Sequence, residues 1–152
     1  MARTPSGATL WLTLFRTTEA VERVARRSMH DAGLGFSDFV LLEALLHVGT
    51  LTPGELAGKC ALTSGSITAA VDRLEARGLV ERQSNPDDQR SRLVRLTASG
   101  RELIERAYAQ HAADIERFVS ATLTAEQRRE LFDLLNTVRK SARDDLTSSD
   151  EG

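Results

Sequence analysis

A change in the spacing of apolar residues near Gly78 is the feature that most constrains the fold. From Thr52 to Gly78 the apolar residues recur every three to four positions, which is the helical period. Residues 79–83 and 93–96 then have the composition of short strands, and the segment between them is rich in turn residues. The sequence therefore predicts a mainly α-helical chain with one small β-hairpin.

Capping signals set the boundaries of the two helices before this change. Thr52 and Glu55 form a capping box with Pro53 at the first helical position. Thr63 is expected to cap the next helix, and Gly78 suits the left-handed residue just past its end. Two short helices separated by a tight turn and followed by a hairpin make a winged helix-turn-helix.

Four further helices flank this unit. One is expected from Ala8 to His30, and another begins at a cap formed by Ser37 and ends at Gly49. After the hairpin, helical spacing returns from Ala98 to Ser120, and Thr124 caps the last helix. At one domain per ~100–200 residues, the 152-residue chain is predicted to be a single domain.

Charge is distributed unevenly along the chain. The net charge is −2, which argues against binding nucleic acid through overall electrostatics. Six arginines and three acidic residues nevertheless fall between residues 77 and 101, so basic charge gathers on the hairpin. Since there is no apolar run near the ~20 residues of a membrane span, no signal-type segment and only one cysteine, we expect a cytoplasmic protein without a membrane partner.

The second helix of the pair carries small and hydroxyl residues where it begins, and arginines lie on the hairpin. A helix of this kind fits the major groove, hydroxyls at its N-terminus suit phosphate oxygens, and hairpin arginines suit the minor groove. An alternative is that the same surface binds another protein. The candidate DNA-binding residues are Thr63, Ser64, Gly65, Ser66, Thr68, Arg73, Arg90 and Arg92.

Several motifs resemble one family of regulators. Residues 63–68 and 71–82 are similar to the recognition helix and first wing strand of the MarR family, the multiple antibiotic resistance regulators of bacteria and archaea. Residues 87–91, followed by Leu96, Thr97 and Gly100, are similar to the family's wing signature. The resemblance implies a DNA-binding transcription regulator, in this case a repressor, that grips a palindromic double-stranded operator as a homodimer.

The resemblance also assigns roles within the wing. Arg90 would enter the minor groove, and Asp88 would orient arginines of the wing or recognition helix. Gln89 departs from the family pattern, which more often has arginine there.

The resemblance also divides the chain. We expect one MarR-like domain over 8–145, with a winged helix-turn-helix lobe at 37–97, dimerisation helices at 8–31 and 98–145, and flexible termini at 1–7 and 146–152. Apolar residues surround the first and last helices more widely than one buried face requires, as with Trp11 and Phe132. A second chain would bury them; the alternative is packing within one chain.

A small aromatic effector, phenolic or quinone-like, is a further implication of the resemblance. Trp11, Phe15, Phe36 and His47 are the candidate residues for its cavity, with ordinary core packing as the alternative.

The remaining reactive residues suggest no enzyme and no cofactor. None of the three histidines has another histidine or a cysteine one helical turn away, so no metal is expected. No phosphate-binding glycine loop or nucleophile elbow is present. Cys60 lies in the turn of the helix-turn-helix, where a cysteine packs as a small apolar residue; the alternative is a thiol-based redox sensor.

Overall fold

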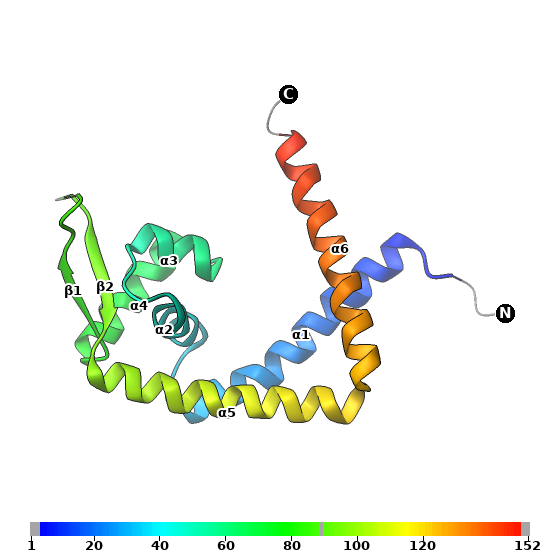
Figure 1. Cartoon of the computed structure of the whole chain (residues 1–152), viewed down its shortest axis with the longest axis horizontal. Helices are drawn as coiled ribbons and strands as arrows, with labels where there is room; N and C mark the ends of the chain where they lie inside the picture. Colours follow the sequence, from blue (N-terminus) through cyan, green and yellow to red (C-terminus); the bar gives the residue numbers. More distant parts are fainter. Residues whose placement is uncertain (1–3, 89, 150–152) are drawn as a thin grey trace. The chain divides into compact units, whose positions relative to one another are not determined.

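The computed structural model describes residues 4–88 and 90–149, and its elements follow the predicted order (Figure 1). The chain divides into two compact units at Asp114, and each is described by itself. The elements are α1 (Gly7–Asp31), α2 (Phe36–Val48), α3 (Pro53–Cys60), α4 (Ser64–Ala76), β1 (Val80–Ser84), β2 (Arg92–Leu96), α5 (Ala98–Thr122) and α6 (Ala125–Ser149). The mainly helical fold with one hairpin is confirmed.

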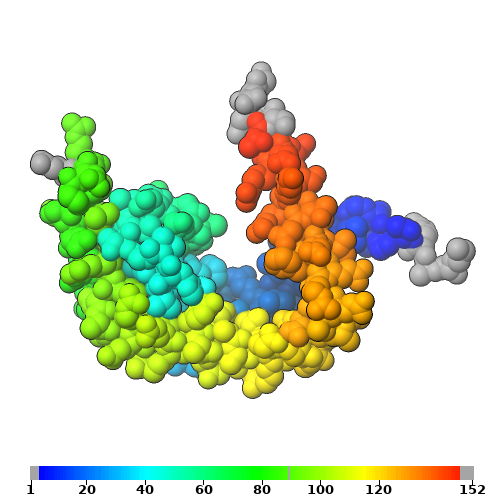
Figure 2. Space-filling view, viewed as in Figure 1, coloured from blue at the N-terminus to red at the C-terminus, as the bar shows by residue number. Residues whose placement is uncertain are grey.

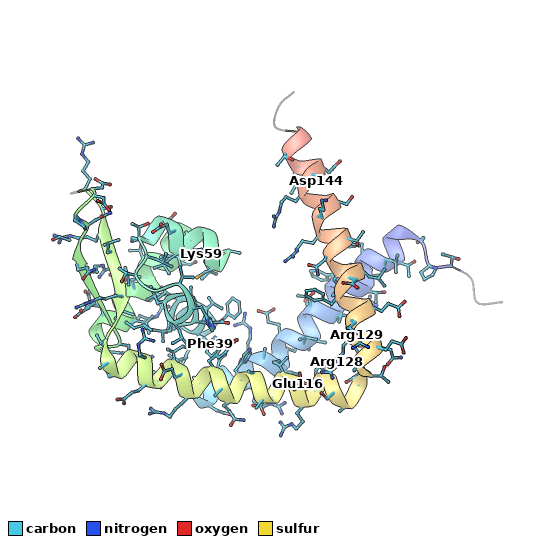
Figure 3. The ribbon with its side chains drawn as sticks, in the orientation of Figure 1. Phe39, Lys59, Glu116, Arg128, Arg129 and Asp144 are labelled. Atoms are coloured by element: carbon cyan, nitrogen blue, oxygen red, sulfur yellow. The ribbon has the colours of Figure 1, made fainter. Side chains whose placement is uncertain are left out.

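The core of the first unit lies among α2, α3, α4 and the hairpin. Phe39 of α2 points into this packed region, as the side-chain view shows (Figure 3). Burial of large apolar side chains is the main favourable term that holds the lobe together. The largest fully buried side chains are Phe39, Leu41, Leu42, Leu45, Leu56, Ile67, Val71, Leu74, Val80, Val94 and Ile104.

The hairpin is antiparallel, and a residue from outside it extends its ladder. Val80 pairs with Leu96 at the base and Ser84 with Arg92 at the far end. Leu51 joins β2 through two backbone hydrogen bonds with Val94, of 2.8 and 3.1 Å. The segment between α2 and α3 is therefore fixed to the wing, which fastens the wing to the helical core.

The capping boxes and the helix-ending glycine are confirmed. Glu55 accepts a 2.7 Å hydrogen bond from the Thr52 amide, and its own amide donates to Thr52 Oγ1 at 3.3 Å. Thr63 accepts from the Ser66 amide at 3.2 Å. Gly78 follows α4 with a φ of 68°, a left-handed conformation that glycine adopts without strain.

The expected Ser37 cap of α2 is wrong. The N-cap is Gly35, which provides no side-chain cap, and α2 begins at Phe36. Ser37 is already inside the first turn, and its hydroxyl accepts a hydrogen bond from Arg73 instead. A residue 36 positions away in sequence therefore determines the role of Ser37.

The second unit contains the end of α5 and all of α6. Thr124 and Gln127 form the expected capping box, with bonds of 2.9 and 3.2 Å. Glu116 pairs with Arg128 at 2.5 Å, and both side chains are visible near the α5–α6 corner (Figure 3). The last helix runs to Ser149, past the expected end at 145. Within residues 4–88 and 90–149, no helix has both the length and the apolar composition needed to cross a bilayer.

Candidate nucleic-acid interface

The N-terminal turn of α4 exposes small and hydroxyl residues. Ser64, Gly65 and Thr68 are exposed, and Ser66 is half-buried. A Cβ added to Gly65 would meet no atom within 4 Å, so the backbone there is open to close approach. The opposite side of the helix is buried through Ile67, Ala70, Val71 and Leu74. The N-terminal turn of α4 is thus presented to solvent with its backbone accessible, as a groove-binding helix requires.

The hydroxyls of this turn are partly engaged within the helix. Thr63 Oγ1 donates to Ser66 Oγ at 2.9 Å while it accepts the capping amide. Thr68 Oγ1 donates to the Ser64 carbonyl at 3.0 Å and keeps its lone pairs free to accept. The turn is therefore stiffened by its own side chains before any ligand binds.

The tip of the wing is built from side-chain-capped turns. Asp88 Oδ1 accepts a 2.9 Å hydrogen bond from the Arg90 amide, and the Ser91 amide donates to the Asp88 carbonyl at 3.1 Å. Asn85 Nδ2 donates to Ser91 Oγ at 2.7 Å across the loop. The Arg90 side chain is exposed at the tip, which projects beyond the helices of the lobe (Figure 2). Gln89 lies outside the described residues.

Two predicted wing residues have contacts that the sequence did not indicate. The carboxylate of Asp88 holds the Arg90 backbone amide, whereas we expected it to orient an arginine side chain. Arg92 Nη1 donates to Ser84 Oγ at 3.2 Å, so this exposed arginine lies where the strands end and the tip begins. Asp88 consequently shapes the loop that carries Arg90.

Arg82 links the wing to α4, and sequence reasoning did not select it. Its guanidinium donates to Asp72 Oδ1 at 2.5 Å and to the Glu75 carboxylate, and its amide donates to Glu75 Oε1 at 3.2 Å. The hydrogen bond to Asp72, followed by that to Glu75, raises the pKa of Arg82. The sequence signal for this link is a pair of acids three residues apart on α4, followed by an arginine on the next strand.

Arg73 is directed towards α2. Its Nη2 donates to Asp38 Oδ1 at 2.6 Å and to Ser37 Oγ at 3.3 Å. The hydrogen bond from Arg73 to Asp38 is the main cause that raises the pKa of the arginine. One turn later, Arg77 Nη1 donates to the Gly33 carbonyl at 3.1 Å. Both arginines thus connect α4 to the segment that begins α2.

The four candidate effector residues take part in three separate aromatic contacts. Trp11 and Phe15 stack on the exposed part of α1, with ring centroids 5.9 Å apart. Phe36 lies under the Arg26 guanidinium at 4.6 Å, and His47 meets the Tyr108 ring edge-on at 4.9 Å. His47 alone of the four borders an open cleft of about 420 Å³ between α2 and α3. The cleft is lined by Val40, Glu43, Ala44, His47, Val48, Lys59 and Cys60.

Cys60 is half-buried at the end of α3. Its thiol donates to the Val40 carbonyl at 3.5 Å. Burial, and secondarily the charge of Glu43, raises the pKa of the thiol. A thiol with a raised pKa is a poor nucleophile at neutral pH, which favours the packing role over the redox role.

His47 and His111 make structural contacts. His111 Nδ1 shares a 2.9 Å hydrogen bond with Ser28 Oγ, and its ring lies 5.0 Å from that of Phe39. No group of three or more His, Cys, Asp or Glu side chains in the described part of the chain is placed to hold a metal ion.

Comparison with known proteins places this geometry in a family. The MarR family profile matches residues 32–91, which include α2, α3, α4 and the wing up to its tip. A transcriptional regulator of the helix-turn-helix type from Bacillus subtilis, MhqR, is 31% identical over 134 residues, which cover 88% of this chain and 92% of MhqR.

Solved structures agree over nearly the whole chain. Sco3205, a MarR family regulator from Streptomyces coelicolor crystallised with DNA, has a TM-score of 0.79 and 27% identity, covering 93% of this chain and 91% of its own. NadR, solved with 4-hydroxyphenylacetate, has a TM-score of 0.71 and 27% identity, covering 91% and 97%. The chain therefore belongs to the MarR family of DNA-binding winged helix-turn-helix transcription regulators, which are not enzymes.

Proposed function

We propose that this protein is a homodimeric repressor that binds a palindromic operator and is released from it by a small aromatic effector. The observation that carries the proposal is the exposed N-terminal turn of α4 beside a wing with an exposed arginine at its tip. This pairing supplies one element for the major groove and one for the minor groove.

Unburied apolar side chains support the homodimer. Trp11 on α1 is 66% exposed and Phe132 on α6 is 67% exposed, whereas Phe39 in the core of the lobe is fully buried. Large apolar side chains left exposed along a helix usually mark a protein-binding surface. The exposed large apolar residues on the two helices are Leu10, Trp11, Leu12, Leu14 and Phe15 of α1, and Leu131, Phe132, Leu134, Leu135, Val138 and Leu146 of α6.

In the proposed complex α4 enters the major groove and the wing reaches the adjacent minor groove. Ser64, Gly65, Ser66 and Thr68 would meet phosphates and base edges, and Thr63 would hold the helix start in place by capping it. Arg90 would enter the minor groove, and Arg92 would contact phosphates near it.

The proposed effector is a small phenolic or quinone-like compound. NadR, a structural relative, was crystallised with a hydroxylated aromatic acid. In this chain Trp11 and Phe15 already form an exposed aromatic stack, so a second chain against α1 would convert an open aromatic surface into an enclosed one. An effector there would bind preferentially to the DNA-incompetent arrangement of the lobes, and a tenfold preference corresponds to ~1.4 kcal/mol.

The test is a gel-shift titration of the wild-type protein on DNA from upstream of its own gene, with Arg90→Ala beside it. Wild-type binding should weaken steeply with salt, and Arg90→Ala, which removes one cation that displaces counterions from the DNA, should reduce the slope by ~0.9. Normal binding by Arg90→Ala at every salt concentration would exclude the wing from the interface.

Dimerisation and effector release have separate readouts. Sedimentation at micromolar concentration should give about twice the 16.7 kDa of one chain, and a monomer contradicts the two-lobe mechanism. A panel of phenols and quinones should contain a compound that changes Trp11 fluorescence and releases DNA over one concentration range. Trp11→Phe should keep the release and lose most of the optical signal; a panel without effect on either removes the aromatic effector.

A further inference from the structure

Arg73 lies on the helix proposed to read DNA, yet its side chain pairs with Asp38 of α2. The Asp38 side chain is 8% exposed and accepts from Arg73 at 2.6 Å, whereas the Arg73 side chain is 51% exposed. A carboxylate buried to this extent needs compensation by hydrogen bonds or an opposite charge. Within the described part of the chain, Arg73 supplies that positive charge.

The contact lies at a junction that matters for the placement of α4. Asp38 is in the first turn of α2, and the residue before it, Ser37, also accepts from Arg73. The residue that follows α4 reaches the same junction, since Arg77 donates to the Gly33 carbonyl. Residues 32–35 connect α1 to α2, and residues 36–38 begin α2, so Arg73 and Arg77 hold the segment through which α1 enters the lobe.

We propose that Arg73 is a positioning residue. Its ion pair with Asp38 fixes the orientation of α4 against α2, and its guanidinium contributes no phosphate contact. The DNA-facing turn at Ser64 needs this support because hydroxyl and amide contacts to DNA depend on the angle and depth at which the helix enters the groove. The inference rests on the proposed use of α4 for DNA binding.

A charge-neutral replacement of the pair distinguishes positioning from contact. Arg73→Gln leaves the Asp38 carboxylate without its cation and should weaken operator binding by about tenfold or more. Asp38→Asn combined with Arg73→Gln removes both charges and keeps two amides that can hydrogen-bond, so affinity should recover most of this loss. The slope of log affinity against log salt should stay at the wild-type value in both variants, because no phosphate contact is lost.

Arg90→Ala is the matched control, because it removes an arginine that the proposed complex places on the DNA. It should reduce the salt slope by about 0.9, and neutralising Asp38 should not restore its affinity. An Arg73→Gln slope reduced by the same amount, with a double variant that binds no better, overturns the positioning role. Wild-type protein that fails to bind the operator at all would instead contradict the proposed function.

A measurement on the wild-type protein tests the same proposal if the variants fail to fold. In ¹⁵N-labelled protein, the Arg73 side-chain resonances should be protected from exchange in the free state by the contact with Asp38. They should remain in place when operator DNA is added, while those of Arg90 shift. A shift of the Arg73 resonances together with loss of the Asp38 contact on DNA binding overturns the proposal.

Discussion

Gly100 offers a sharp test of how the wing is joined to the rest of the lobe. It is buried near the start of α5 and faces the backbone of Leu79, the residue before β1. A Cβ added at Gly100 would lie 1.8 Å from the Leu79 carbonyl oxygen and 2.8 Å from its carbonyl carbon. Gly100→Ala therefore forces the start of the wing away from α5.

The Leu79 backbone has little freedom to yield. Its carbonyl oxygen accepts from the Thr97 amide at 3.1 Å, and Thr97 Oγ1 in turn donates to the Gly78 carbonyl at 2.7 Å. Overpacking costs ~1–3 kcal/mol, and loss of one backbone hydrogen bond costs ~0.5–1.5 kcal/mol. We expect Gly100→Ala to lower the free energy of unfolding by about 2–4 kcal/mol, and Tm by about 5–15 °C at this chain length.

Circular dichroism melts at fixed protein concentration measure this effect, with Gly58→Ala as the control. Gly58 is inside α3 and has open space where its Cβ would lie. Alanine is favoured over glycine inside a helix by ~0.5–1 kcal/mol, so the control should melt at or slightly above the wild-type Tm. If Gly100→Ala melts with the wild type, the close packing of α5 on the wing is refuted.

Three further variants test contacts found in the structure. Arg82→Gln should speed hydrogen exchange of the β1 amides by breaking the link to Glu75, and unchanged exchange contradicts that link. The hydrogen bonds from Thr52 lower the pKa of Glu55 in the folded state. The stabilisation that they provide is therefore present above ~pH 4.3 and is lost as the pH falls through the lowered pKa. Glu55→Gln should flatten this acidic part of the plot of Tm against pH. Because the pKa of Cys60 is raised, its thiol should react with iodoacetamide more slowly than free cysteine at pH 7, and Cys60→Ala should keep DNA binding; rapid alkylation or loss of binding would indicate a reactive role.

The features that the sequence predicts well are those that neighbouring residues determine. The Thr52 capping box, the Thr63 cap and the left-handed Gly78 all depend on side chains within a few positions. The hairpin follows from the change of apolar period, because strand and helix place buried residues at different spacings. The cap of α2 was wrong because α2 begins at Phe36 after Gly35, which places Ser37 inside its first turn, where the hydroxyl accepts from an arginine of another helix.

The candidate interface could be predicted only in part for the same reason. The exposed turn at Ser64 and the exposed Arg90 follow from local pattern and motif. The partners of Arg73 and Arg82 depend on which elements the core brings together, and spacing along one helix carries no such information. The sequence does not distinguish an arginine that pairs with a buried acid from one that binds a phosphate.

Selection of DNA by the wild-type protein from a random library is the most direct test of the central claim, that two copies of α4 and the wing read an operator together. We expect enrichment of an inverted repeat whose half-sites are centred about 10 bp apart or a multiple of that spacing. Binding of the selected DNA should weaken steeply with salt. A single unrepeated motif, or no enrichment above the starting library, would contradict it.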